Sequence, residues 1–426
     1  MAVFANSEGP LEQVEERDVA RSIRSHALGW WMAANLVGVW LAVLLIWPQW
    51  GDWMAPLSYG RWMPLHLNWQ LYGWCALPLV GVLLKWILWL PHPQAVGHAR
   101  VALAAWSMAL ALGGLSWLGG VTSGKLFLDW HGWARFVLPG AMTILWTVLA
   151  AHVWWGWRQR ALSDRWAQAG VVAGLLAVPA VLYWVSSQKV YPAVNPDSGG
   201  ATGAALLGST LGIVAIFGSM PHGLNVRRLN ERARSRSVAI FWTSWGLSMM
   251  VWLLIDRGNS SHHDGSQILG LGVLMLWVPM LVWWWRQFDW GEGARPWLHA
   301  AMVWWAILVL SGWLSFLPGI SEKMKFTNGL VAHAHLAMAG LLTSVNGVIL
   351  NQLDGSRPIR RGMHLWQTAT AVHVLVLMVV GWLELSRPGE FFAGASWVTA
   401  GFAVRLLAGV AMTFASVQLF YEIRKS

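Results

Sequence analysis

Apolar residues fall into twelve long blocks that are separated by short polar stretches. The blocks cover 28–48, 64–90, 99–120, 131–157, 166–186, 200–221, 237–256, 266–286, 297–318, 329–351, 364–385 and 395–422. Each is close to the roughly 20 residues that a helix needs to cross the hydrocarbon core of a bilayer. The pattern predicts an all-α membrane protein with twelve transmembrane helices. We expect residues 1–27 to form a cytoplasmic N-terminal segment and residues 28–426 to form a single transmembrane domain.

The amino-acid composition supports the membrane assignment. Hydrophobic residues make up 56% of the 426 residues and charged residues only 11%, whereas a soluble domain carries about 25% charged residues. The first apolar block is too long, and begins too far into the chain, for a cleavable signal peptide. The single cysteine, Cys75, excludes a disulfide framework and a cysteine-rich metal site. The chain also has no CxxCH motif, so we expect no haem that is covalently attached through one.

Positive charge is concentrated in alternate loops. If the N-terminus lies inside, the inner loops hold most of the Lys and Arg residues, including the arginine-rich stretch 227–236. The positive-inside rule therefore predicts that both termini face the cytoplasm. The net charge of +10 needs no nucleic-acid partner, because the positive charge falls in alternate loops. The stretch 227–236 could also bind anionic membrane lipid, but topology alone explains it. Three cations remain within predicted spans: Lys85, Arg135 and Arg405.

Two histidines, His333 and His335, lie in the tenth predicted span. A helix turns about 100° per residue, so side chains two positions apart point about 200° apart. The two imidazoles therefore leave the helix on nearly opposite faces and cannot bind one metal together. Ionisable residues at membrane depth are costly and usually functional, so we interpret the pair as ligands of two different cofactors. The alternative is a pair of histidines that are hydrogen-bonded within the helix bundle.

A partner for this pair lies in the second span. His66 is near the outer end of that span in the predicted topology, at the depth of His333 and His335. Two neutral histidines from different helices at one depth can ligate a haem iron from both sides. Arg61 lies at the water boundary just before His66, where it can pair with a haem propionate. The alternative for Arg61 is an ordinary interfacial arginine.

These features together resemble subunit I of the haem–copper oxidase superfamily. The shared features are twelve spans, the sequence Arg61-Trp62-Met63-Pro64-Leu65-His66 in the second span, and His333-Ala334-His335 in the tenth. The chain is most similar to the C-type (cbb-type) cytochrome c oxidases and their nitric oxide reductase relatives. The resemblance implies that His66 and His335 bind a low-spin haem b and that His333 binds a high-spin haem from its proximal side. It also implies a multi-pass protein of the bacterial inner (plasma) membrane.

The sequence departs from this family at the second metal of the active site. The family holds a copper, or an iron in the nitric oxide reductases, with one histidine in the sixth span and two adjacent histidines at the end of the seventh. Neither position has a histidine here: the seventh span ends in Leu254-Ile255-Asp256. His262 and His263 are adjacent but lie just before the eighth span. The C-type tyrosine at the start of the seventh span and the reductase glutamates also have no counterpart, so we expect no copper and no O₂ reduction.

We therefore predict a b-type membrane cytochrome with one or two haems b and a degenerate, copper-free second site. It would transfer electrons within a respiratory complex, with a cytochrome c or iron–sulfur protein on the outer face, or with quinone. One alternative is an active terminal oxidase or nitric oxide reductase whose metal ligands, His262 and His263, are rearranged. A second alternative is a transporter or structural membrane subunit without a cofactor.

Overall fold

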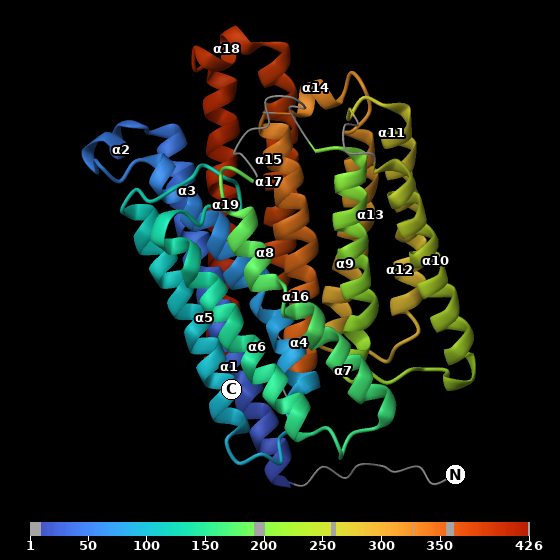
Figure 1. The fold of residues 1–426 in the computed structure, drawn as a ribbon. Coiled ribbons are helices and arrows are strands. Elements are labelled where there is room, and N and C mark those ends of the chain that lie inside the picture. Colours follow the sequence, from blue (N-terminus) through green and yellow to red (C-terminus); the bar gives the residue numbers. More distant parts are fainter. Residues whose placement is uncertain (1–9, 191–200, 257–260, 326, 355–361, 425–426) are drawn as a thin grey trace.

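The chain forms a bundle of long, nearly parallel and antiparallel helices (Figure 1). The computed structural model describes residues 10–190, 201–256, 261–325, 327–354 and 362–424. In these residues the regular secondary structure is helical, apart from one isolated β-bridge between Arg228 and Phe288. Twelve helical spans are long and apolar enough to cross a membrane. This confirms the all-α class and the number of spans that the apolar pattern predicts.

The helical elements follow one another along the chain with short connections. They are α1 (Pro10–Ile46), α2 (Gln49–Trp53), α3 (Tyr59–Asn68), η1 (Trp69–Cys75), α4 (Leu77–Ile87), α5 (Ala95–Leu118), η2 (Gly132–Phe136), α6 (Val137–Trp155), α7 (Leu162–Leu175), α8 (Val178–Val185), α9 (Gly203–Gly223), η3 (Glu231–Ala233), α10 (Arg234–Ile255), α11 (Gly265–Leu271), η4 (Gly272–Leu276), α12 (Trp277–Trp285), α13 (Ala294–Leu314), α14 (Ser321–Met324), α15 (Asn328–His335), η5 (Leu336–Leu342), α16 (Thr343–Leu353), α17 (Met363–Ser386), α18 (Pro388–Phe392) and α19 (Ser396–Arg424).

Two spans change helix type partway across. The second span consists of α3, η1 and α4, and the tenth consists of α15, η5 and α16. In both spans the middle element is a π-helix, which has wider turns than the α-helices on either side. These are the two spans that carry His66 and the His333–His335 pair.

Two helices begin earlier than their apolar patterns indicate. The first helix starts at Pro10, so much of the expected N-terminal segment continues the first span as helix. The second span starts at Tyr59, five residues before the predicted start at Pro64. Pro64 is the sixth residue of α3 and lies inside the helix, where it removes one intrahelical hydrogen bond. Proline therefore does not mark the helix boundary here.

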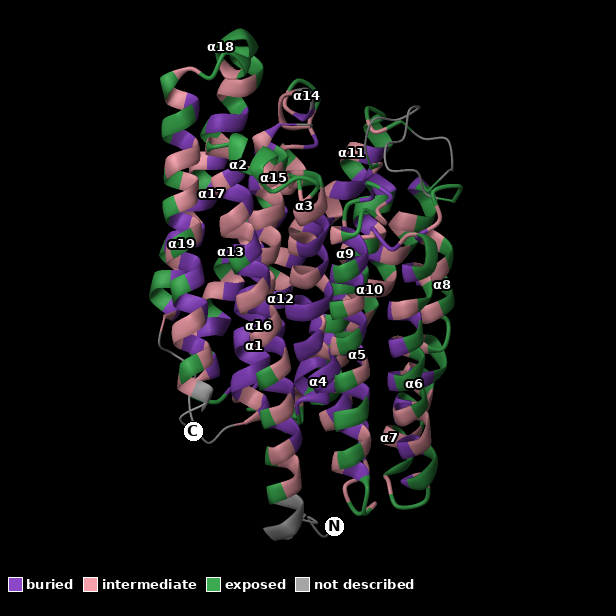
Figure 2. Cartoon of the chain, turned by 90° about the vertical axis from the view of Figure 1, so that its left-hand side faces the viewer, coloured by how far each residue is buried: buried purple, intermediate pink, exposed green. Residues whose placement is uncertain are grey.

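The span that carries the histidine pair lies at the centre of the bundle. In its most apolar window 78% of the residues are buried, against 11% in the span Glu231–Ile255. Figure 2 shows buried residues gathered along α4 and α16 and exposed residues on the outer faces of the bundle. Around its histidine-bearing half, α15 contacts α17, α17 contacts α19, α19 contacts α1, and α1 contacts α3, while η1 contacts η5. These contacts close a ring of helices, and the ring positions the site described next.

Candidate haem-binding site

The imidazoles of His66 and His335 lie opposite one another inside this ring. Their ring centroids are 6.5 Å apart and their planes differ by only 25°. One imidazole comes from α3 and the other from the last residue of α15. The structure thus brings together the two residues that the sequence pairs by depth, although they are far apart along the chain.

A backbone carbonyl orients each imidazole. Nδ1 of His66 donates to the carbonyl of Ala34 on α1, and Nδ1 of His335 donates to the carbonyl of Val331 on its own helix, both at 2.8 Å. A carbonyl oxygen only accepts hydrogen bonds, so Nδ1 carries the proton in both rings and Nε2 carries the lone pair. In the part of the chain that the structure describes, neither Nε2 has a hydrogen-bond partner. Both histidines are therefore in the tautomer that a metal ligand requires.

The spacing of the rings matches two axial ligands on one metal ion. With nitrogen–metal bonds of about 2.0–2.1 Å, and a ring centroid roughly 1.1 Å behind each nitrogen, a metal between two Nε2 atoms separates the centroids by about 6.3 Å. The observed separation is 6.5 Å. Both side chains also keep partial accessibility, although the surrounding helices enclose them.

Gly38 of α1 fixes how closely the His66 ring approaches that helix. A Cβ at position 38 would lie 2.6 Å from Cε1 and 2.9 Å from Nδ1 of His66. Contacts this short do not occur between real side chains, so any residue other than glycine would displace the ring. Gly38 and Ala34 lie one helical turn apart on α1. Gly38 leaves room for the His66 ring, and the Ala34 carbonyl orients it.

The π-helical turns join the two histidine-bearing spans through polar contacts. Nε1 of Trp74 in η1 donates to Oγ1 of Thr343 at 2.8 Å, and Nδ2 of Asn346 donates to the carbonyl of Trp74 at 2.8 Å. A π-turn shifts the phase of the side chains that follow it and is frequent at functional sites. Here both π-turns begin within three residues of a candidate ligand. We infer that the two π-turns set the direction in which His66 and His335 leave their helices.

Two further polar residues lie beside the pair. His373 of α17 has its ring centroid 4.6 Å from that of His335, and it is 6% exposed. Arg405 of α19 lies within electrostatic range of His66, His335 and His373. Sequence analysis assigned no role to either residue. The signal that points to them is an ionisable side chain within a predicted span, which is functional by default at membrane depth.

His333 leaves the helix on the other face, as its spacing from His335 predicts. It lies against α13, where a Cβ on Gly312 would be 3.3 Å from Cε1 of His333. Its Nδ1 is buried without a hydrogen-bond partner. His333 and His335 are thus directed at different helices and do not share one site. Whether a second haem binds at His333 stays a prediction.

Arg61 contacts the end of a neighbouring helix. Its NH1 group donates to the carbonyl of Leu118 at 2.9 Å, and its guanidinium lies over Gly120, whose φ is +85°. A side chain at position 120 would come within 3.1 Å of Arg61 and would also be strained at this positive φ. Arg61 therefore hydrogen-bonds the carbonyl of the last residue of α5. Its pairing with a propionate stays a prediction.

The adjacent histidines His262 and His263 lie in the loop before α11. Their ring centroids are 3.9 Å apart, and α11 packs on α9 and α10. No group of three or more His, Cys, Asp or Glu residues in the described ranges has the geometry of a metal site.

Replacing both His262 and His263 by alanine is expected to leave the haem content unchanged, because the helix that follows them, α11, packs on α9 and α10 and not on the histidine-bearing helices α3 and α15. Haem and metal content per chain, measured on the purified variant, tests this. Loss of haem, or loss of a metal that the unaltered protein holds, would place the pair in the site.

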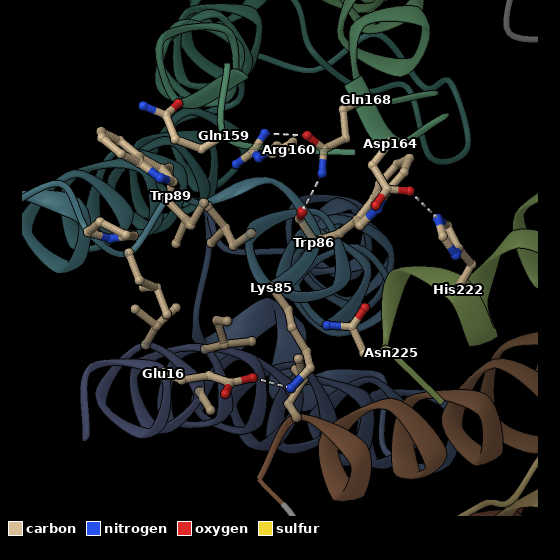
Figure 3. A pocket seen from close by; sticks show the side chains of 18 of the residues that line it. Glu16, Lys85, Trp86, Trp89, Gln159, Arg160, Asp164, Gln168, His222 and Asn225 are labelled. Atoms are coloured by element: carbon tan, nitrogen blue, oxygen red, sulfur yellow. Dashed lines mark hydrogen bonds and ion pairs between the residues drawn. The ribbon is translucent and has the colours of Figure 1, made fainter. Parts of the chain in front are cut away.

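The opposite end of the bundle holds a second polar region around a cavity of about 600 Å³ (Figure 3). Its charged groups are partnered with each other or with neighbouring polar groups. Glu16 pairs with Lys85, Asp164 lies 3.7 Å from His222, and Arg160 donates to Gln168 and to a backbone carbonyl. Beside this cavity, Nδ1 of His98 is 3.2 Å from Nε2 of His152. These contacts stabilise the packing of the helix ends.

Comparison of the sequence with protein-family models and with curated proteins found no match. The fold and the candidate site therefore rest on the residues and geometry described above.

Proposed function

We propose that the protein is a membrane-embedded b-type cytochrome that resembles subunit I of the haem–copper oxidases and transfers electrons within a respiratory complex. The observation that carries the proposal is the facing pair His66 and His335, with the spacing and tautomers of two axial ligands. Among the described residues no third protein ligand completes a metal site here. Two histidines suit an iron whose other four ligands come from a porphyrin, so the pair favours haem over a bare metal ion.

The proposed chemistry is one-electron transfer. The haem, when bound, supplies an iron that alternates between the ferric and ferrous states. The residues of the chain hold it in place: the Ala34 and Val331 carbonyls fix the two ligand rings, and Gly38 sets their approach. With both His66 and His335 bound to it, the haem iron would have no position open for O₂ or NO. This coordination suits electron transfer and opposes direct reaction with a gas.

The second site of the proposal is built around His333. Its buried Nδ1 has no hydrogen-bond partner, and its ring lies against α13, away from His66. A second haem b there would have His333 as its only identified ligand. We propose that this site lacks copper, because the histidines that hold copper in the related oxidases have no counterparts in this sequence.

We further propose a location in the bacterial inner membrane with both termini in the cytoplasm. The charge distribution of the loops supports it, and Figure 1 shows the start of α1 and the end of α19 at the same end of the bundle. The histidines then lie in the outer half of the membrane. At that depth the electron partner is a cytochrome c or an iron–sulfur protein on the outer face, or quinone in the membrane.

Carbon monoxide distinguishes electron transfer from oxygen chemistry, because it binds only to a ferrous haem with an open axial position. We expect the reduced spectrum of the His66–His335 haem to be unaffected by CO and the copper content to be negligible. A CO shift confined to a second haem component would indicate an occupied His333 site. A CO shift of the whole haem spectrum, or stoichiometric copper, would instead support the terminal oxidase.

A further inference from the structure

We propose that Arg405 and His373 form a buried subsite for a carboxylate group of the molecule held between His66 and His335. This inference rests on the proposed function, in which that molecule is a haem b with two propionate carboxylates. It assigns to Arg405 and His373 the role of binding a propionate, which the sequence indicates only for Arg61.

Arg405 is a cation within a membrane span that has no partner of opposite charge among the described residues. It lies on α19 inside the span Ser396–Glu422 and is partly buried. In the described part of the chain its guanidinium makes no hydrogen bond or ion pair. An uncompensated charge at membrane depth is costly and requires a partner.

Three other cations that lie within spans, Arg24, Lys85 and Arg135, have partners, in contrast to Arg405. Arg24 pairs with Asp354, and Lys85 pairs with Glu16. Arg135 donates to the carbonyl of Tyr183 at 2.6 Å and to Oγ of Ser186 at 3.3 Å. The fold therefore supplies partners to these cations and leaves Arg405, beside the histidine pair, for an anion that the chain does not provide.

His373 supplies a second donor at the same place. Both of its ring nitrogens are buried without a hydrogen-bond partner, and its ring lies 4.6 Å from that of His335. The Arg405 backbone lies beside the His373 ring, but outside hydrogen-bonding geometry. A buried polar side chain without any partner is unusual in a folded protein. A carboxylate here accepts from the His373 N–H and neutralises the Arg405 charge.

The test compares haem b with its dimethyl ester, in which both carboxylates are neutral and the porphyrin and iron are unchanged. The full-length chain, purified without haem, is titrated with each form, and low-spin absorption reports binding. We expect the unaltered protein to bind the free acid about 10- to 100-fold more tightly, the range for one buried charge-assisted contact. Arg405→Met should reduce this preference to less than about threefold, and His373→Leu should reduce it partially.

Arg135→Met is the matched control, because it removes a cation within a span that Tyr183 and Ser186 already partner. It should keep most of the preference for the free acid. If Arg61→Met abolishes the preference and Arg405→Met retains it, the carboxylate binds at Arg61 and the subsite is wrong. Equal binding of acid and ester by the unaltered protein also overturns the subsite but leaves the haem site intact. Binding of neither form removes the proposed function and the subsite together.

A second measurement needs no haem. Arg405→Met removes an uncompensated charge, so it should raise the thermal unfolding temperature of the haem-free protein. Arg135→Met removes a partnered cation and should lower that temperature. A fall for Arg405→Met equal to that for Arg135→Met would show that Arg405 has a structural partner and would overturn the subsite.

Discussion

Replacing either His66 or His335 by alanine is expected to abolish the low-spin haem spectrum of the purified protein. Each residue supplies one of only two protein bonds to the proposed iron, and their centroids lie 6.5 Å apart, as two axial ligands require. Alanine removes the Nε2 lone pair and leaves space where the ring was. Reduced-minus-oxidised spectra of both variants, normalised to protein, measure the effect.

His26→Ala is a matched control for these two variants. His26 is also a partly buried histidine within a span, and its Nδ1 is 2.7 Å from Oγ of Ser107 on α5. Its loss costs a hydrogen bond and some packing but removes no candidate ligand, so the spectrum should persist. A low-spin spectrum that survives both His66→Ala and His335→Ala would show that the pair does not hold the haem.

Gly38→Ala is expected to weaken haem binding about 5- to 150-fold although it changes no ligand. The added methyl group would lie 2.6 Å from Cε1 of His66, and the ring cannot turn aside without losing its hydrogen bond to Ala34. Overpacking of this kind typically costs about 1–3 kcal/mol, and about 1.4 kcal/mol is tenfold in affinity. Haem retained per chain after purification, or the affinity for added haem, measures the loss.

Gly29→Ala serves as the control on the same helix. A Cβ at position 29 meets no atom within 4 Å, and alanine is a better helix former than glycine. This variant should bind haem as well as the unaltered protein. If both glycine variants behave alike, the close packing of His66 against α1 has no part in haem binding.

The sequence predicts the number of spans and the divergence of His333 and His335, because both follow from local periodicity. The apolar pattern defines twelve spans, and the two-residue spacing of His333 and His335 requires opposite faces of one helix. The structure directs one towards His66 and the other towards Gly312. Pairing His66 with His335 needs only the depth of each residue, which the predicted topology provides.

The features that sequence analysis missed depend on contacts between distant helices. Regular periodicity cannot reveal the π-turns η1 and η5, which are stabilised by contacts such as that between Trp74 and Thr343. The apolar pattern likewise does not show that α17 and α19 bring His373 and Arg405 to the pair. Gly38 is indistinguishable in the sequence from Gly29, and only the packing of His66 separates them.

Haem content per chain, together with the reduced spectrum, tests the central claim most directly. The full-length protein is purified from haem-replete cells, and its non-covalent haem is extracted and quantified against protein. We predict one or two haems b per chain, with a reduced low-spin spectrum that disappears in His66→Ala. A well-folded preparation that contains no haem, and that takes up none when haem is added, would contradict the account and favour a transporter or structural subunit.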